Sequence, residues 1–574
     1  MAAVAFAVGA IVGAHSGGSP AESLAARYVN AWAHADYATM YSELDPATRG
    51  SLSAGGLASD YEEALTTATA TSERTAGRAS SLSGGRVSVP VAVSTRLFGS
   101  LSLAFELTIV ETGGNSYVRW SPSLAFPGLH QGEQLSRRTT LPQRAALLAR
   151  DGSVLAEGPS GAAVAVAGNG GEGSRTSPLG EAGAAVLGTV GPMSTSRRHA
   201  LGAEGVPADA LVGVSGLELA LDDRLRGTPG GELLAGTRVI ASAAPRAAPA
   251  VRTSISPSLQ RATAAALGGQ YGGIVAIVPS SGQILAVAGI GLDGLQPPGS
   301  TFKMVTVTGA LAAHVAKPDT VFPYATYATL DGVKLHNANG EECGGTLENA
   351  FAVSCNSVFS PLGVKLGAAQ LVQTAEAYGF NQPSGVTGAP ASTLPPARQI
   401  QGELDIGSTA IGQGEVLATP LQMATVAATI GDGGRRPRPS FLADSSPAFV
   451  ARASSSSVAR TVRHLMIQVV RAGTGAAAAI PGVTVAGKTG TAELKSQCTT
   501  QQTGSEQSSS SSSAKESCQG TETEASNTDA WFAAFAPALH PRIAVCVLLV
   551  KDGAGGTTAA PVARAVIEAA LAGY

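Results

Sequence analysis

Three groups of nucleophilic and basic side chains follow one another in the second half of this 574-residue chain. They are Ser300 with Lys303, Ser354 with Asn356, and the segment Lys488-Thr489-Gly490-Thr491. A serine hydroxyl is a weak nucleophile at neutral pH and needs a base within hydrogen-bond reach. A lysine three positions further along a helix lies on the same face, so Lys303 could take the proton of Ser300. Together these side chains are suited to attack on an amide next to a carboxylate.

Lys303 can accept a proton only if its pKa is lowered by burial or by a second cation, and Lys488 is the candidate cation. Ser354 and Asn356 are one residue apart, so in an extended or loop conformation both would face one cleft. Ser354 would then pass a proton to the leaving amine, and Asn356 would hold the substrate backbone and contact Lys303. The alternative is a local turn that caps a helix beginning near Ser357.

The third group follows an apolar run, Val483 to Ala486, which predicts a strand. Gly490 would leave room for a ligand backbone beside this strand, and a strand edge can bind an extended peptide. Lys488 and the hydroxyls of Thr489 and Thr491 suit a terminal carboxylate. The alternative for this segment is a plain turn between strands.

These groups need a rigid framework, and the pattern of apolar residues predicts one. Helices are expected from Thr301 through Leu311 and over Ala560 to Ala572, with an antiparallel sheet beneath them. Its strands are expected at 273–278, 284–288, 484–492, 530–535 and 543–550.

The first part of the chain predicts a small α+β domain, with helices over 21–40 and 58–67 and strands over 86–93 and 101–110. A segment rich in glycine, alanine and proline follows from about residue 137 to 250 and predicts a pedestal or linker with a hairpin turning at Asp151-Gly152. Ala2 to Ala14 is apolar but too short to span a bilayer as a helix. We interpret it as the remnant of a membrane anchor or signal, or as a buried or frayed terminus.

Composition narrows the class of protein. A length of 574 residues predicts two to four domains, and a net charge of -3 leaves no basic field for a nucleic acid. Neither His-x-x-x-His nor Cys-x-x-Cys spacing occurs, so no metal site and no cofactor are expected. In an oxidising compartment Cys343 could pair with Cys355, and Cys498 with Cys518, whereas Cys546 suits a buried strand. The alternative is that all five cysteines are reduced.

The motifs resemble those of penicillin-binding proteins and class A β-lactamases. The motifs occur in the order, and with the spacing of 54 and then 134 residues, that is typical of the transpeptidase domain of class B penicillin-binding proteins, which this chain resembles. Three further segments are similar to that domain: 411–415, 419–423 and Asp529 to Phe532. Residues 213–218 and 225–230 resemble the link segment of that class. The layout of the first domain resembles the nuclear-transport-factor-like cone that precedes some members. The resemblance covers roughly residues 135 to 574.

The fold implied is α+β and multidomain. An apolar segment (1–19) precedes a nuclear-transport-factor-like domain (20–135), a strand-rich pedestal of the dimerisation type (136–250) and a penicillin-recognising transpeptidase domain (251–574), whose antiparallel sheet is flanked by helices. The implied activity is D,D-transpeptidation, in which Ser300 forms an acyl-enzyme with a peptidoglycan stem peptide or a β-lactam. Backbone N–H groups of Ser300 and Thr491 would form the oxyanion hole. The implied location is the extracytoplasmic face of the bacterial membrane, held by an N-terminal anchor, with a glycosyltransferase of the cell-wall machinery as a partner.

Two alternatives remain at this stage. A class D-like β-lactamase shares Ser-x-x-Lys and Lys-Thr-Gly, although Asn356 and the long upstream region argue against a simple hydrolase. The other alternative is a noncatalytic β-lactam sensor or cell-wall scaffold. An insertion from about Leu494 to Ser526, with six consecutive serines at 508–513, predicts either an inert surface loop or a gate. His336 is interpreted as a surface or packing residue rather than a base.

Overall fold

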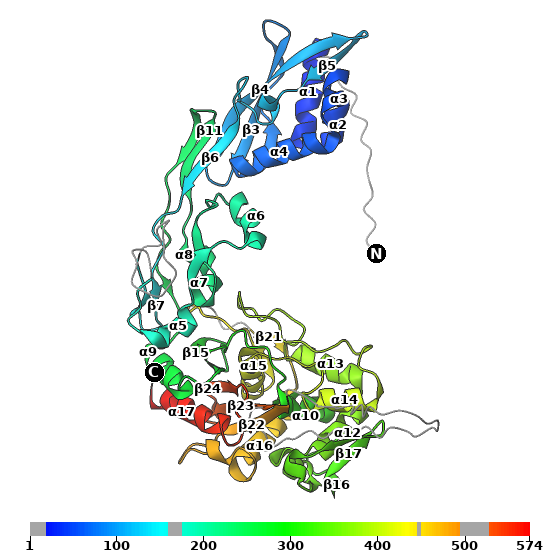
Figure 1. The fold of residues 1–574 in the computed structure, drawn as a ribbon, viewed down its shortest axis with the longest axis vertical. Helices are drawn as coiled ribbons and strands as arrows, with labels where there is room; N and C mark the ends of the chain where they lie inside the picture. Colours follow the sequence, from blue (N-terminus) through cyan, green and yellow to red (C-terminus); the bar gives the residue numbers. More distant parts are fainter. Residues whose placement is uncertain (1–18, 159–174, 445–448, 494–526, 574) are drawn as a thin grey trace, which may run out of the picture. The chain divides into compact units, whose positions relative to one another are not determined.

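The computed structural model describes residues 19–158, 175–444, 449–493 and 527–573 (Figure 1). The chain divides into two compact units, and each is continuous in space but not in sequence. The first consists of residues 1–144, 192–211 and 226–248, and the second of residues 145–191, 212–225 and 249–574. The expected pedestal segment, 136–250, is therefore shared between the two units. The apolar residues 1–18 and the insertion 494–526, with Cys498 and Cys518, lie outside the described residues.

The first unit is an α+β domain, as the sequence predicts. Helix α1 (Pro20–Ala33) begins at a capping box of Ser19 and Glu22 and buries Leu24, Tyr28 and Trp32 on one face. The prediction of one helix over 21–40 is wrong in one respect. The helix ends before Ala35, whose φ is 53°. Asp36 then caps a separate helix, α2 (Tyr37–Ser42), by accepting from the N–H of Thr39. The other helices of this unit are α3 (Pro46–Ser51), α4 (Ala54–Ala68) and α6 (Thr195–Ala203).

Helices α1 and α4 pack on a sheet in the order β1-β3-β4-β5, with β2 also paired to β3. Its strands are β1 (Ala70–Thr75), β2 (Ser80–Ser81), β3 (Arg86–Thr95), β4 (Gly99–Thr112) and β5 (Asn115–Arg119). A second sheet has the order β12-β11-β6, with β6 (Leu135–Thr140), β11 (Gly230–Ala235) and β12 (Arg238–Ala243). Leu233 of β11 joins the same apolar core as Trp32 and Phe105.

The second unit contains a five-stranded antiparallel sheet in the order β15-β14-β24-β23-β22. The strands are β14 (Gly272–Ile277), β15 (Ile284–Gly289), β22 (Ala486–Glu493), β23 (Thr528–Ala536) and β24 (Ile543–Leu549). Helices α9 (Pro257–Leu267) and α17 (Ala559–Ala572) bury alternate residues of these strands in one core. Helix α15 (Pro420–Gly431) packs on β14, β23 and β24, and α16 (Ser456–Ala472) packs on β22 (Figure 1). This is the architecture predicted from the sequence.

The remaining elements of the second unit surround that sheet or precede it. The short strands β7 (Leu147–Leu148), β8 (Val154–Ala156) and β13 (Val251–Arg252) form one small sheet, and β9 (Val190–Pro192) pairs with β10 (Leu211–Gly213). Three two-stranded sheets complete the strands. They are β17 (Tyr327–Leu330) with β18 (Val333–His336), β16 (Val321–Ala325) with β19 (Cys343–Thr346), and β20 (Arg435–Pro437) with β21 (Phe449–Arg452). The helices are α5 (Glu181–Leu187), α7 (Gly216–Ala220), α8 (Asp222–Leu225), α10 (Lys303–Ala312), α11 (Leu347–Ala352), α12 (Asn356–Leu366), α13 (Ala368–Ala377) and α14 (Gly402–Ala410).

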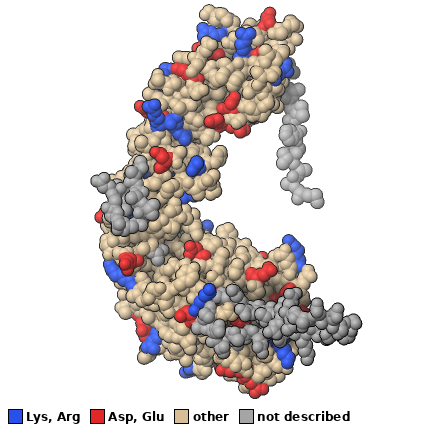
Figure 2. Space-filling view, in the orientation of Figure 1, with Lys and Arg blue, Asp and Glu red and all other residues tan. Residues whose placement is uncertain are grey.

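Acidic and basic side chains are interspersed on the face shown in Figure 2. Cys343 and Cys355 form a disulfide, so the alternative in which every cysteine is reduced is wrong. Cys546 is a free cysteine buried in β24, where the sequence predicts it. Across residues 19–158, 175–444, 449–493 and 527–573, a search for a helix with the length and hydropathy to span a membrane finds none.

Candidate active site

Ser300 lies in a single 3-10 turn, Gly299–Phe302, that runs directly into α10. Thr301 and Phe302 are buried beneath the turn, whereas Ser300 is only partly buried. The N–H of Gly299 donates to the carbonyl of Gly412 at 3.0 Å, which connects the turn to the loop that follows α14. Gly299 has a φ of 50°, and a Cβ there would lie 2.6 Å from the carbonyl oxygen of Thr491. The backbone beside Ser300 therefore packs directly against strand β22.

Lys303 is fully buried at the start of α10, and its amine contacts the second motif. Its Nζ donates to the carbonyl of Ser354 at 2.7 Å and to Oδ1 of Asn356 at 2.7 Å. The hydroxyl of Ser354 is 3.3 Å from the same nitrogen. The ring of Phe359 lies 5.6 Å away and forms an apolar wall. The predicted contact between Lys303 and Asn356 is present.

Lys488 contacts the same serine from strand β22. Its side chain is fully buried on β22, and Nζ donates to Oγ of Ser354 at 2.8 Å and to the carbonyl of Thr489 at 3.0 Å. Burial lowers the pKa of Lys488 to about 7, because the charged ammonium has lost its water. This lysine therefore changes its charge near neutral pH.

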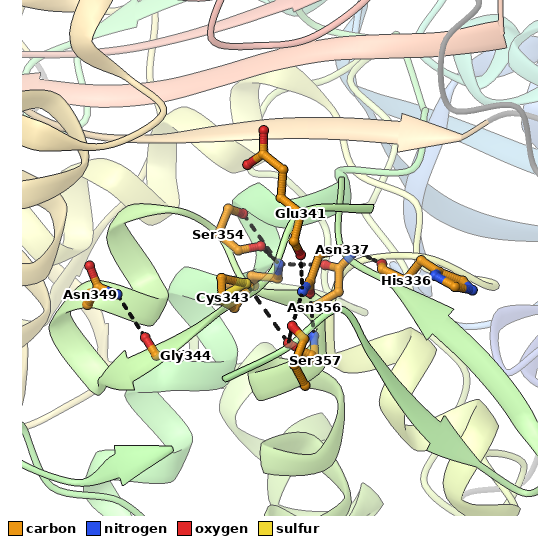
Figure 3. The surroundings of a disulfide bond; sticks show 12 residues. His336, Asn337, Glu341, Cys343, Gly344, Asn349, Ser354, Asn356 and Ser357 are labelled. Atoms are coloured by element: carbon orange, nitrogen blue, oxygen red, sulfur yellow. Dashed lines mark hydrogen bonds between the residues drawn. A yellow bond between two sulfur atoms is a disulfide. The ribbon is translucent and has the colours of Figure 1, made fainter. Parts of the chain in front are cut away.

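Ser354 and Asn356 are positioned by the junction between α11 and α12. Ser354 adopts a φ of 65°, which is uncommon for a residue with a side chain, and Asn356 is the first residue of α12. The alternative in which these residues cap the helix is wrong. The N-cap is Cys355, and the amide of Asn356 bonds instead to Lys303 and, through Nδ2, to the carbonyl of His336 at 2.9 Å (Figure 3).

The hydroxyls of the third motif have defined partners. Oγ1 of Thr489 lies 2.6 Å from Oγ1 of Thr474, and Oγ1 of Thr491 accepts weakly from the N–H of Gly555 at 3.4 Å. Gly490 differs from the expectation that its missing side chain makes room for a ligand. A Cβ at Gly490 would lie 2.7 Å from the carbonyl of Pro298, so the turn that carries Ser300 occupies this space.

The structure therefore joins Lys303, Ser354, Asn356 and Lys488 by direct hydrogen bonds and sets the Ser300 turn against β22 beside Thr491. Sequence reasoning missed Thr474, which follows the last turn of α16 and carries no motif of its own. His336 is exposed and its ring lies 5.4 Å from that of Tyr327, in keeping with a surface residue. In the described part of the chain no cluster of three His, Cys, Asp or Glu residues could hold a metal ion.

Comparisons with known proteins agree with this arrangement. Three protein-family models match the chain. The penicillin-binding protein transpeptidase domain matches residues 272–568, and the penicillin-binding protein dimerisation domain matches residues 169–237. The NTF2-like N-terminal transpeptidase domain matches residues 20–133. The peptidoglycan D,D-transpeptidase PbpA of Mycobacterium tuberculosis is 33% identical over 387 residues, which cover 56% of this chain and 72% of that protein. The peptidoglycan D,D-transpeptidase MrdA of Acinetobacter baumannii is 27% identical over 457 residues. These residues cover 69% of this chain and 66% of MrdA.

Solved structures give the same result. The crystal structure of PBPA from Mycobacterium tuberculosis has a TM-score of 0.56 and 29% identity, covering 75% of this chain and 99% of that one. A penicillin G acyl-enzyme complex of the same protein has a TM-score of 0.55 at 28% identity, with coverage of 75% and 99%.

A sheet covered by helices, with two lysines converging on one serine at its edge strand, defines the class of penicillin-recognising serine enzymes. Within that class, the chain belongs to the penicillin-binding protein transpeptidase family and carries an NTF2-like N-terminal domain.

Proposed function

We propose that the protein is a peptidoglycan D,D-transpeptidase that cross-links stem peptides through an acyl-enzyme on Ser300, and that β-lactams acylate the same serine. The observation that carries the proposal is the position of Ser354. Its carbonyl accepts from Lys303 and its hydroxyl accepts from Lys488, so one residue lies between the two amines. The printed names of the two D,D-transpeptidase relatives support the assignment.

Lys303 is suited to be the base for Ser300. A neutral amine has two N–H groups and one lone pair, and the two short bonds of Nζ go to the carbonyl of Ser354 and to Oδ1 of Asn356. In the neutral form these bonds use both N–H groups, the hydroxyl of Ser354 lies 3.3 Å from the same nitrogen, and the lone pair would accept the proton of Ser300. Ser300 Oγ would then bond to the carbonyl carbon of the penultimate D-alanine.

The later steps use the other side chains. The C–N bond of the D-alanyl-D-alanine amide breaks, and Ser354 delivers a proton to the departing D-alanine amine while it takes from Lys303 the proton that came from Ser300. The N–H groups of Ser300 and Thr491 would stabilise the oxyanion. Thr489 and Thr491 would bind the donor peptide and its terminal carboxylate, with Lys488 supplying positive charge below its pKa. An amine of a second stem peptide then attacks the ester and releases Ser300 with its proton restored.

The setting of the enzyme is also part of the proposal. We place it on the extracytoplasmic face of the bacterial membrane, attached by an N-terminal anchor and working with a glycosyltransferase of the cell wall. We also propose that the chain divides into four parts, with boundaries at residues 19, 135 and 250. The family matches to residues 20–133, 169–237 and 272–568 support this order of domains.

Fluorescent penicillin tests the function directly. The wild-type protein should form an adduct that survives denaturing electrophoresis, and peptide mass mapping should place it on Ser300. Ser300→Ala should form none. An adduct that turns over within seconds would indicate a β-lactamase instead, and no adduct on the folded wild type would refute the proposal. Cross-linking of lipid-linked stem peptides then separates a transpeptidase, which produces dimers, from a sensor, which does not.

A further inference from the structure

The segment from His336 to Cys343 lies beside the second motif and contacts it at three consecutive residues (Figure 3). The carbonyl of His336 accepts from Nδ2 of Asn356 at 2.9 Å. Oδ1 of Asn337 accepts from the N–H of Ser357 at 2.8 Å. Cys343 forms the disulfide with Cys355. Residues 355, 356 and 357 are thus each joined to one short stretch of chain.

Asn337 is the polar centre of this stretch. Its side chain is 3% exposed, and Nδ2 donates to the carbonyls of Ala325 at 2.7 Å and Glu341 at 2.8 Å. With Oδ1 bonded to Ser357, both ends of the amide are used. One buried side chain therefore connects the end of β16, the loop before β19 and the first turn of α12.

The start of α12 needs such support because its own sequence does not provide it. The first N–H groups of a helix lack partners within the helix, and a serine, threonine, asparagine or aspartate at the N-cap normally accepts from one of them. The N-cap here is Cys355, whose sulfur is committed to the disulfide. Asn337 supplies the missing acceptor from a different segment.

Ser354 depends on the same support. Its φ of 65° is unfavourable for a residue with a Cβ and persists only where the surrounding structure holds it. The disulfide holds Cys355, the residue after Ser354, and Lys303 donates to the carbonyl of Ser354. A release of Cys355 would let Ser354 relax towards negative φ and would turn its hydroxyl away from Lys488.

We propose that Asn337 and the Cys343–Cys355 disulfide are positioning residues for the reaction: they hold Ser354 and Asn356 in the geometry that the two lysines require. The inference rests on the proposed function, because it concerns the rate at which Ser300 is acylated. It predicts that loss of either tie slows acylation while the protein stays folded and still binds the β-lactam.

The test measures acylation by fluorescent penicillin over a range of concentrations, which separates the dissociation constant of the first complex from the rate constant of acylation. The variants are Asn337→Ala and the double variant Cys343→Ser with Cys355→Ser. A displacement of about 1 Å at a reacting group can reduce a rate about 100-fold. We expect the acylation rate constant to fall at least tenfold, with the dissociation constant changed less than threefold.

Asn349→Ala is the matched control. Like that of Asn337, its amide donates to a backbone carbonyl, here that of Gly344 in β19 at 2.8 Å, but the bonds found for it do not reach residues 354–357 (Figure 3). Its acylation rate constant should stay within threefold of wild type. Melting curves check the fold of each variant. If a variant fails to fold, the wild type can be treated with dithiothreitol instead. The reagent reduces the disulfide to two thiols and is itself oxidised to a cyclic disulfide. Peptide mapping then confirms Cys343 and Cys355 as the reduced pair.

Unchanged acylation after loss of the disulfide and in folded Asn337→Ala would overturn the inference. An equal loss of rate in Asn349→Ala would also overturn the inference. It would show that any loss of support for β19 slows acylation, whether or not the lost bond reaches residues 354–357. A wild-type protein that forms no adduct would instead refute the proposed function, so the two failures are distinguishable. Asn337→Asp adds a diagnostic: it keeps the acceptor for Ser357 and should recover part of the rate that Asn337→Ala loses.

Discussion

Lys488 shows how burial alone alters one side chain of the site. Its pKa is about 7 in the folded protein, against the ordinary lysine value of about 10.4 that applies when the chain is unfolded. Between these two values the unfolded chain binds more protons than the folded one, so stability rises with pH in this range. The charge on Lys488 therefore opposes folding most strongly below pH 7.

Lys488→Met removes this titration and makes the effect measurable. Relative to the variant, the wild type should gain up to about 1.4 kcal/mol of stability per pH unit between pH 7 and 10, and nothing between pH 5 and 6. Calorimetry at several pH values gives the difference, with the relevant transition assigned by its shift when the wild type is acylated with penicillin. Lys365→Met, at an exposed position in the same unit, controls for the exchange itself. A difference that stays flat to pH 10 would contradict the prediction.

The three motifs and their resemblance to the transpeptidase family were enough to predict the contact of Lys303 with Asn356 and the place of Lys488 beside them. They could not predict the φ of Ser354 or the role proposed for Asn337, because both depend on a segment whose bonds to residues 355–357 span 12 to 20 positions in sequence. The sequence left the pairing of Cys343 with Cys355 open for the same reason. A separation of twelve residues permits a disulfide but does not require one.

The turn that carries Ser300 is held by two close backbone contacts, and one of them can be tested at the level of the element. Gly412 has a φ of 76°, and a Cβ there would lie 2.1 Å from the carbonyl of Gly299 and 2.7 Å from Cβ of Phe302. Gly412→Ala should push the turn out of place and reduce the rate of penicillin acylation at least tenfold.

Gly414→Ala provides a matched control for that prediction. Gly414 lies in the same loop with a similar φ of 68°, so alanine at either position carries the same conformational cost. A Cβ at Gly414 would meet only Ser408 Cβ, at 4.0 Å. Gly414→Ala should therefore acylate at nearly the wild-type rate. Equal losses in the two variants would show that loop conformation, not the contact with the turn, controls the site.

Periodicity predicted the five strands of the main sheet and α4, α10, α17, β3 and β4 to within a few residues, since these elements bury apolar side chains. It did not predict α3, which has no buried residue. The break between α1 and α2 was missed because apolar residues recur at a helical spacing on both sides of Ala35, and the local cap at Asp36 decides the boundary. Gly490 was misjudged for a related reason. A glycine in a strand predicts a close approach, but the sequence does not say whether a ligand or the chain itself makes it.

Among the described residues, two apolar cores lie in different compact units, and this predicts how the chain unfolds. One core contains Trp32 and Phe105, whose rings meet edge to face at 4.9 Å, and the other lies between the five-stranded sheet and α9 with α17. All the site residues discussed above belong to the second unit. Sequence position alone could not predict these units, because residues 192–211 and 226–248 return to the first one.

Trp32→Ala and Ile567→Ala test this division as a pair, since both side chains are buried, one in each core. Trp32→Ala should destabilise the first unit by about 3–5 kcal/mol, and Ile567→Ala should destabilise the second by about 2–5 kcal/mol. In calorimetry each variant should lower one transition and leave the other in place. Penicillin labelling at 25 °C should match wild type in Trp32→Ala, and in Ile567→Ala the capacity for labelling should disappear at a lower temperature than in wild type. A single transition that both variants lower equally would show that the two cores unfold as one, because a separate core loses only its own packing when one of its side chains is removed.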